Sequence, residues 1–307
     1  MGNLLWLQMA GCGGCTVSLL DACNGGFWDN FHRLGGKLLW HPALSLEDDP
    51  SRVFAQIFQE EINLDILCLE GAIAGNNFPL EILQKLASKA RYVIAAGSCS
   101  SFGGIPLASG GLTGMGVQYL GHNPGALLDE EWLSQGKLPV INIAGCPPHP
   151  DWLAEAILGL LMEDVPKLDS LGRPKAFSDH LAHHGCNRNE YYEFKASALR
   201  PSHLGCLMEN LGCKATQAAG DCNRRRWNGF GSCTNAGFPC ISCTSPNFEE
   251  TGHSFMETAK IAGIPIALPT DMPKAWFVAL VALSKSAMPD RVKKNATSDH
   301  VLVPPEP

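Results

Sequence analysis

The sequence contains no apolar run long enough to cross a membrane. Its longest apolar stretch, residues 275–283, is about half of the roughly 18 residues that a membrane-spanning helix needs, so we expect a buried helix there. Positive charge is also scarce, because 23 Lys and Arg residues face 30 Asp and Glu residues and leave a net charge of −7. Such a chain does not attract nucleic acid or anionic lipid, so neither is an expected partner. The N-terminal segment lacks the charged region of a secretory signal, which predicts a cytoplasmic protein.

Cysteine, in contrast, is abundant. The chain has 13 cysteines among 307 residues, and 45% of its residues are hydrophobic while only 17% are charged. This composition is typical of a well-packed globular protein. A cytoplasmic location and an odd number of cysteines both disfavour a framework of disulfides. The cysteines therefore indicate metal or cluster ligation.

The first half of the sequence alternates short apolar runs with helical patterns. Each apolar run is bounded by Gly, Pro or polar residues, as is typical of a parallel strand that is buried on both faces. Five strands are expected, at residues 3–7, 37–40, 64–69, 92–96 and 139–144. Between them, Pro79 is expected to begin one helix, and Asp151 to cap another that Pro166 stops. The alternation predicts a doubly wound α/β domain over residues 1–170.

A second domain is expected at residues 171–290. Its first part, residues 172–252, is rich in Gly, Pro and Asn and holds seven of the 13 cysteines. Such a region has little apolar core and needs metals or clusters as cross-links. Helices are expected at residues 253–262 and 274–286, and the polar, Pro-rich residues 291–307 are expected to form a tail.

Four cysteines of the first domain directly follow predicted strands. Cys12 and Cys15 follow the first strand, Cys99 follows the fourth and Cys146 follows the fifth. The carboxyl ends of parallel strands meet at one edge of an open sheet, where α/β proteins build their ligand sites. Glycines in each loop let the backbone approach a bulky group. Four thiolates at one place are what a cubane [4Fe-4S] cluster needs.

Two further groups of ligand-type residues lie in the second domain. One group comprises His183, Cys186, Cys206 and Cys213, and the other comprises Cys222, Cys233, Cys240 and Cys243. Three thiols and an imidazole suit either a zinc site or a cluster with one His ligand. His180 and His184 are rival ligands, but the His-x-x-Cys spacing favours His183. The two cysteines left over, Cys23 and Cys68, are expected to pack in the core.

Eight short segments carry a resemblance that a lone Cys-x-x-Cys motif does not. They are LWLQMAGCGGCTVSLL, LLWHP, LEGAI, GSCSSFGGIP, GCPPHP, HHGC, LGCKA and FPCISCTSPNF, in this order between about residue 3 and about residue 260. In this set and order they resemble the small subunits of [NiFe] hydrogenases. The resemblance implies a flavodoxin-like parallel-sheet domain, an irregular iron–sulfur cluster domain after it, and three clusters in a line.

The resemblance also implies which residues bind each cluster. The proximal [4Fe-4S] cluster takes Cys12, Cys15, Cys99 and Cys146, the distal cluster takes His183, Cys186, Cys206 and Cys213, and the medial cluster takes Cys222, Cys240 and Cys243. Many family members have proline at the position of Cys233 and a medial [3Fe-4S] cluster. A thiol at Cys233 supplies the missing ligand, which implies a medial [4Fe-4S] cluster of lower potential.

Other departures from the family pattern are informative. The interval from Cys206 to Cys213 is one residue longer than in the commonest version. Gly13, Gly14 and Gly104 occupy positions that leave no extra thiol for the modified proximal cluster of oxygen-tolerant, membrane-bound relatives. The chain also shows neither an export signal nor a C-terminal anchor helix, which places it nearer to the cytoplasmic uptake and hydrogen-sensing enzymes.

The implied function is electron transfer within a hydrogenase. Hydrogen is oxidised at the Ni–Fe centre of a separate large subunit, and single electrons pass through the three clusters to an acceptor. No residue of this chain is an expected bond-breaking catalyst. Glu70 either assists proton movement at the subunit interface or is a plain strand-end carboxylate, which is favoured. A higher oligomer of such heterodimers is the expected assembly.

Three other functions fit parts of the sequence. A hydrogen-sensing regulatory subunit keeps the clusters but works by binding a signalling partner. A thiol–disulfide oxidoreductase uses Cys12 and Cys15 between a strand and a helix, and leaves most other cysteines unexplained. A multi-zinc binding protein uses the same thiols without redox chemistry.

Overall fold

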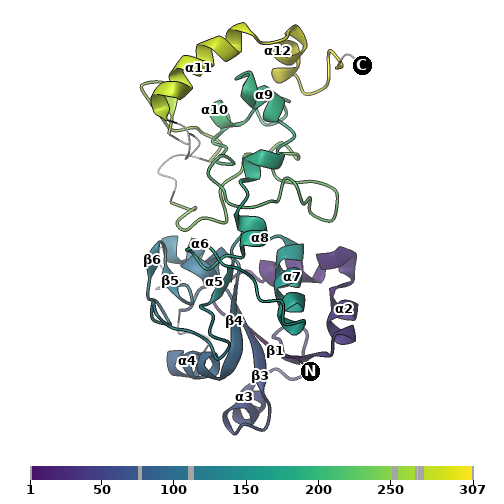
Figure 1. Ribbon diagram of the computed structural model, residues 1–307, viewed down its shortest axis with the longest axis vertical. Coiled ribbons are helices and arrows are strands. Elements are labelled where there is room, and N and C mark those ends of the chain that lie inside the picture. Colours follow the sequence, from purple (N-terminus) through teal and green to yellow (C-terminus); the bar gives the residue numbers. More distant parts are fainter. Residues whose placement is uncertain are drawn as a thin grey trace. The chain divides into compact units, whose positions relative to one another are not determined.

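The computed structural model describes residues 2–74, 78–109, 114–250, 255–266, 268 and 273–305 (Figure 1). The chain divides into two compact units. The first unit comprises Met1–Phe177 and Cys243–Glu250, and the second comprises Ser178–Ser242 and Thr251–Pro307. Within the described residues, no helix is both long and apolar enough to span a membrane.

The first unit is built on a sheet of five parallel strands. The strands are β1 (Gly2–Gln8), β2 (Gly36–Trp40), β3 (Leu64–Glu70), β4 (Ala90–Ala96) and β7 (Ile141–Ile143). They lie in the order β2-β1-β3-β4-β7, so the chain crosses over between β2 and β3. This is the flavodoxin-like order, in which the second strand along the chain lies at one edge beside the first. The five predicted strands and the predicted fold class are confirmed.

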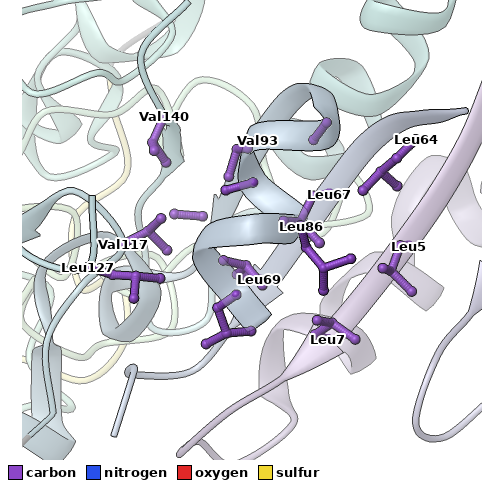
Figure 2. Close-up of a cluster of buried hydrophobic side chains, with 14 of the residues drawn as sticks. Leu5, Leu7, Leu64, Leu67, Leu69, Leu86, Val93, Val117, Leu127 and Val140 are labelled. Carbon is purple, nitrogen blue, oxygen red and sulfur yellow. The ribbon is translucent and has the colours of Figure 1, made fainter. Parts of the chain in front are cut away.

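The sheet is held by apolar side chains on both of its faces. Figure 2 shows Leu5 and Leu7 of β1 and Leu67 and Leu69 of β3 near Leu86, and all five are fully buried. Burying one such side chain contributes about 1.5–3 kcal/mol. Because the central strands are buried along almost their whole length, the loops at their ends start from fixed positions.

Helices and a small hairpin connect the strands. They are α1 (Gly14–Leu20), the 3-10 helix η1 (Ala22–Gly25), α2 (Phe27–Arg33), α3 (Ser51–Phe58), α4 (Leu80–Lys89), α5 (Ser98–Phe102), α6 (Gly104–Ala108), β5 (Tyr119–Leu120), β6 (Asn123–Pro124), α7 (Pro150–Leu161) and α8 (Lys175–Ser178). Helix α4 begins one residue after Pro79, which stands at its N-cap. The cap of α7 is His149, whose Nδ1 accepts the backbone N–H of Asp151 at 3.2 Å, so the predicted cap at Asp151 is wrong.

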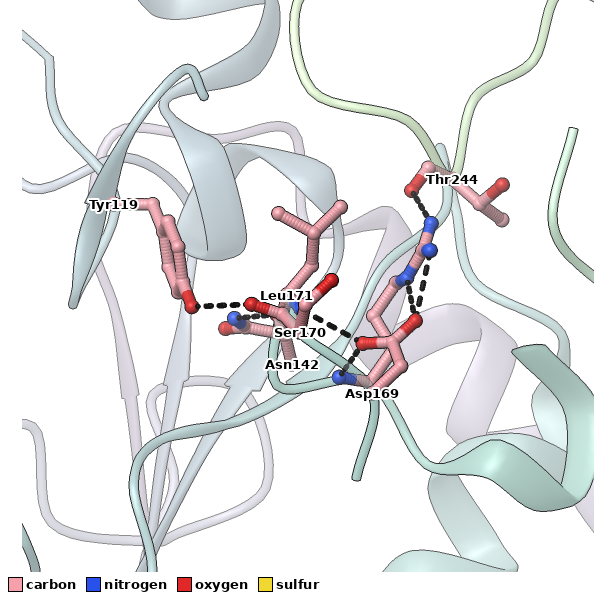
Figure 3. A network of polar contacts seen from close by, with 7 residues as sticks. Tyr119, Asn142, Asp169, Ser170, Leu171 and Thr244 are labelled. Carbon is pink, nitrogen blue, oxygen red and sulfur yellow. Dashed lines mark hydrogen bonds and ion pairs between the residues drawn. The ribbon is translucent and has the colours of Figure 1, made fainter. Parts of the chain in front are cut away.

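Residues 243–250 are bound to the first unit by a polar network (Figure 3). The Asp169 carboxylate accepts the backbone N–H groups of Leu171 and Arg173, both at 2.9 Å, and forms an ion pair with the Arg173 side chain at 2.8 Å. Arg173 also donates to the carbonyl of Thr244 at 3.1 Å. This carboxylate therefore shapes its own turn and orients the arginine that holds the later segment.

The second unit has little regular structure. Its elements are η2 (Ala182–Gly185, a 3-10 helix), α9 (Asn189–Glu193), α10 (Met208–Leu211), β8 (Lys260–Ile261), β9 (Ile264–Pro265), α11 (Lys274–Ser286) and α12 (Asp290–Ala296). Helix α11 confirms the helix predicted at residues 274–286. Its predicted burial is wrong, because Phe277 is buried while Trp276, Val278 and Leu283 are exposed. A compact apolar cluster that includes Tyr192, Leu207, Cys213 and Phe277 forms the core of this unit.

The helix predicted at residues 253–262 is wrong where the structure describes it. Strands β8 and β9 form a short antiparallel hairpin instead. Ala262 and Gly263 have φ values of 50° and 80°, which is the left-handed conformation that a two-residue hairpin turn requires. Residues 253 and 254 lie outside the described part of the chain.

Helix α12 overlaps the predicted tail. Val292 and Ala296 are buried against neighbouring apolar side chains. The Asn295 carboxamide oxygen then accepts the backbone N–H groups of Leu302 and Val303 at 2.9 and 3.0 Å. These contacts fix the chain after α12, which a polar, Pro-rich composition alone does not predict.

Candidate metal-cluster sites

Cys12, Cys15, Cys99 and Cys146 lie beyond the carboxyl ends of β1, β4 and β7. Cys15 is in the first turn of α1, Cys99 is in α5, and Cys146 lies in the loop after β7. Burial raises the pKa of the Cys15, Cys99 and Cys146 thiols, in the case of Cys99 to about 11, and the nearby Cys12 thiol raises each further. All three thiols thus lie close enough to Cys12 to respond to its charge, as expected for loops at one edge of the sheet.

Two glycines leave the space that these thiols occupy. At Gly97, where φ is +86°, an added Cβ would lie 2.5 Å from Sγ of Cys15. At Gly104, where φ is +50°, it would lie 3.1 Å from Sγ of Cys99. At both positions φ is positive and a sulfur atom lies close to where a Cβ would be. Backbone strain and steric overlap with sulfur therefore each disfavour a side chain there. Four thiols are the donor set that a cubane iron–sulfur cluster takes.

Ser98 joins the loops that carry the later thiols. Its hydroxyl accepts the backbone N–H of Gly145 at 2.9 Å, and its own N–H donates to the Gly145 carbonyl at 2.9 Å. The hydroxyl also donates to the carbonyl of Cys243. The residue before Cys99 therefore positions the residue before Cys146. Nothing in the local sequence identifies this role, because both partners are distant along the chain.

Glu70 fixes the loop that carries Cys12 and Cys15. Only 2% of this residue is exposed. Its Oε1 accepts the backbone N–H of Cys15 at 2.9 Å and that of Thr16 at 3.3 Å. Its Oε2 accepts the Trp6 indole N–H at 3.1 Å and the Thr16 hydroxyl. The carboxylate is thus fully engaged in holding the cysteine loop, which is a more specific role than either of the two predicted for it.

His41 completes this network and was not identified from the sequence. Its Nε2 lies 3.1 Å from the Thr16 hydroxyl, and its Nδ1 accepts the backbone N–H of Ala43 at 3.0 Å. Burial lowers its pKa to about 4. Because Nδ1 is an acceptor, the proton of the neutral ring is on Nε2 and faces Thr16.

In the second unit, His183, Cys186, Cys206 and Cys213 line one small cavity. Burial raises the pKa of Cys206 to about 12 and that of Cys213 to about 11. The backbone N–H of Arg188 points to Sγ of Cys186 at 3.4 Å, and that of Cys240 to Sγ of Cys213 at 3.4 Å. Backbone donors aimed at sulfur stabilise the thiolate form that binds iron.

Of the three candidate histidines, only His183 is among the residues that line this cavity. Its ring packs edge-on against Tyr192 with the ring centroids 4.3 Å apart. His180 instead lies 3.2 Å from the guanidinium of Arg224, and Nδ1 of His184 accepts the backbone N–H of Leu181 at 3.4 Å. The geometry therefore favours His183 over both rivals.

The third group is divided between the two units. Cys222, Cys233 and Cys240 belong to the second unit and Cys243 to the first. Cys233 is exposed, and Sγ of Cys240 accepts the backbone N–H of Ser242 at 3.4 Å. The gathering of these four thiols stays a prediction from the sequence.

The two remaining cysteines differ from each other. Cys68 is fully buried in β3, as predicted. Cys23 is exposed, so its predicted core packing is wrong. It lies in η1 with φ of 54°, where a tight turn leaves the side chain in solvent.

Among the residues that the structure describes, no three His, Cys, Asp or Glu side chains form a group that could hold a single metal ion. A cubane cluster does not need such a group, because each of its four irons takes one protein ligand. A flavodoxin-like sheet with thiols gathered at its strand ends defines the class of the protein, an α/β oxidoreductase subunit.

Comparison with known proteins gives the family. The family model described as NADH ubiquinone oxidoreductase, 20 Kd subunit, matches residues 12–160, and the model for the C-terminal part of the NiFe/NiFeSe hydrogenase small subunit matches residues 178–256. The F420 non-reducing hydrogenase II small subunit of Methanosarcina mazei is 33% identical over 303 residues, which cover 85% of this chain and 77% of the relative. This chain belongs to the small-subunit family of [NiFe] hydrogenases. It is the electron-transfer partner of a large subunit.

Solved structures agree with this assignment. The actinobacterial-type NiFe-hydrogenase from Ralstonia eutropha matches with a TM-score of 0.75 and 28% identity, over 94% of this chain and 92% of that one. The Ni-Fe-Se hydrogenase from Desulfomicrobium baculatum matches with a TM-score of 0.72 and 28% identity, over 83% of this chain and 98% of that one. Small subunits of this family carry iron–sulfur clusters, so the thiol–disulfide and multi-zinc alternatives are not favoured.

Proposed function

We propose that this chain carries three [4Fe-4S] clusters and relays electrons from the Ni–Fe centre of the large subunit to an acceptor. The observation that carries the proposal is the cavity that His183, Cys186, Cys206 and Cys213 line together. The convergence of Cys12, Cys15, Cys99 and Cys146 in the first unit supports it. The former set would hold the distal cluster and the latter the proximal one.

The clusters supply one-electron redox chemistry, and this chain's residues set its conditions. Glu70 holds the Cys15 loop at a fixed place, and Gly97 leaves room beside the sulfur. Burial of Cys213 limits the access of water to the distal site, which favours the less charged state of a bound group. Neutral His183 adds no negative charge, unlike a fourth thiolate.

The medial site would differ from the common family pattern by having a fourth protein ligand. Cys222, Cys240 and Cys243 would bind it together with Cys233, whose thiol stands where many relatives have proline. A fourth thiolate supports a [4Fe-4S] cluster rather than a [3Fe-4S] cluster. It also adds negative charge, which should lower the medial potential.

Location, acceptor and assembly are further parts of the proposal. We place the protein in the cytoplasm, as a higher oligomer of heterodimers that reduces an acceptor near the distal cluster. Cell fractionation and native mass spectrometry of the purified complex test these points. Membrane-associated or exported protein, or a single heterodimer, would contradict them.

The central test separates hydrogen chemistry on the large subunit from electron relay through this chain. Exchange of D2 with water protons needs no acceptor, whereas reduction of an artificial acceptor needs the relay. In the purified complex, His183→Ala should lower acceptor reduction at least tenfold and leave the exchange rate unchanged. His184→Ala is the matched control and should preserve both. If the parent and His183→Ala reduce the acceptor at equal rates, the proposed electron relay through the distal cluster is contradicted. Slow acceptor reduction by the parent would also contradict it and would favour the sensing role.

A further inference from the structure

Arg188 is a buried cation beside the distal ligands. Only 7% of this residue is exposed. Its Nε donates to the carbonyl of Thr234 at 2.9 Å, and one terminal nitrogen donates to the carbonyls of His203 and Gly205, both at 2.6 Å. These bonds hold the guanidinium in one orientation, so its charge has a fixed position.

No carboxylate among the described residues pairs with this charge. The anionic groups that face it are thiols, because Cys186, Cys206 and Cys213 all interact electrostatically with the guanidinium. Arg188 also lines the same cavity as these three and His183. The Tyr191 hydroxyl also interacts electrostatically with it.

The buried guanidinium of Arg188 is stabilised by a nearby negative charge. Burying a charge without an opposite charge costs several kcal/mol, and carbonyl dipoles offset only part of this cost. Arginine stays protonated in proteins, so it does not escape the cost by losing its proton. The structure therefore keeps a permanent positive charge next to three sulfur atoms.

The consequence concerns the cluster that these ligands would hold. Three thiolates and a neutral imidazole make the bound cluster anionic, and its reduction adds one more negative charge. A nearby fixed cation stabilises the more negative form more strongly. The potential of an iron–sulfur cluster rises accordingly with positive charge around it.

We propose that Arg188 raises the reduction potential of the distal cluster by its charge, and so makes this cluster a better electron acceptor from the rest of the chain. The proposal rests on the proposed function, because it needs a distal cluster. Arg188 is a positioning residue in this role, since it touches no iron and binds no substrate. Its effect is electrostatic and is separable from folding.

The test is a redox titration of the purified complex, with the distal cluster followed by EPR. Arg188→Gln removes the charge, and Arg188→Lys keeps it. At the midpoint potential of the parent cluster, the ratio of reduced to oxidised cluster should fall at least tenfold in Arg188→Gln, which is 59 mV for one electron. In Arg188→Lys the midpoint potential of the distal cluster should shift by less than half as many millivolts as in Arg188→Gln. Arg52→Gln, at an exposed position in α3 of the first unit, is the control and should leave the ratio unchanged.

Each outcome decides the proposal. A distal cluster in Arg188→Gln with the parent potential would overturn it. If Arg188→Gln loses iron while Arg188→Lys keeps it, the charge itself is needed and the proposal stands. Loss of iron in both variants makes Arg188 a structural residue and overturns it. If the parent complex shows no distal cluster, the proposed function fails first, which iron analysis of the parent reveals.

Discussion

The backbone N–H of Cys15 donates a hydrogen bond to Oε1 of Glu70 at 2.9 Å, across 55 residues of sequence. Glu70 is the last residue of β3, and Cys15 follows β1, its neighbour in the sheet. The strand pairing thus places the carboxylate under the cysteine loop. A buried carboxylate that accepts two backbone N–H groups fixes that loop before any metal binds.

Replacing this carboxylate should destabilise the protein. In Glu70→Gln, one oxygen still accepts the N–H of Cys15, but an amide now faces the Trp6 indole N–H, which is also a donor. Hydrogen bonds to a charged group contribute about 1.5–3 kcal/mol. We expect a loss of this size in the free energy of unfolding, measured by urea denaturation. Glu61→Gln, at an exposed position, is the control, and an equal effect of both substitutions would contradict the role of Glu70.

A side chain at Gly97 should displace the proximal cluster. Gly97→Ala puts a Cβ 2.5 Å from Sγ of Cys15, so we expect about four irons per chain to be lost, which is one cubane. Gly25→Ala is a matched control, because Gly25 has φ of +83° and open space around its Cβ position. The control should lose only about 1–2 kcal/mol from backbone strain. Full iron content in Gly97→Ala would refute the placement of the cluster beside Cys15.

Cys233 should decide the type of the medial cluster. Cys233→Pro removes the fourth thiol, so we expect a [3Fe-4S] signal in the EPR spectrum of the oxidised complex and the loss of about one iron per chain. Cys23→Ser, at an exposed cysteine outside the three groups, should show neither change. A Cys233→Pro spectrum without the new signal would remove Cys233 from the ligand set.

His41 should make stability depend on pH. Burial lowers its pKa from 6.5 to about 4, so the unfolded chain binds the proton more readily than the folded chain does. The stabilisation is present above pH 6.5 and is lost as the pH falls towards 4, by about 1 kcal/mol between pH 7 and pH 5.5. In His41→Gln, the free energy of unfolding in urea should change between pH 7 and pH 5.5 by about 1 kcal/mol less than in the parent. His122→Gln, at an exposed position, should behave as the parent does, and an unchanged pH dependence in His41→Gln would disprove the assignment.

The strands were predictable because their signals are local, and so was the position of Cys12, Cys15, Cys99 and Cys146 after them. A parallel strand buried on both faces must be apolar along its length, as LDILCL and YVIAA are. The cysteines then follow from topology, since strands of one sheet end at one edge. The spacing also predicted that His183 lies near Cys186, with which it lines one cavity; its ligand role stays a prediction.

The features that the sequence did not predict depend on backbone conformation or on contacts between distant segments. The hairpin of β8 and β9 depends on two left-handed residues, Ala262 and Gly263, and alanine gives no sign of that conformation. Ser98, Glu70 and Arg188 act through partners that are distant in sequence or through backbone carbonyls, which carry no side-chain signature. Such roles become visible only when the fold brings the segments together.

The most direct test of the account is the iron and acid-labile sulfide content of the complex purified with its large subunit. Three cubanes and the single iron of the Ni–Fe centre predict about 13 iron atoms and about 12 sulfides per heterodimer, with visible absorption that hydrogen bleaches. Zinc in place of iron, with no visible charge-transfer absorption, would contradict the account.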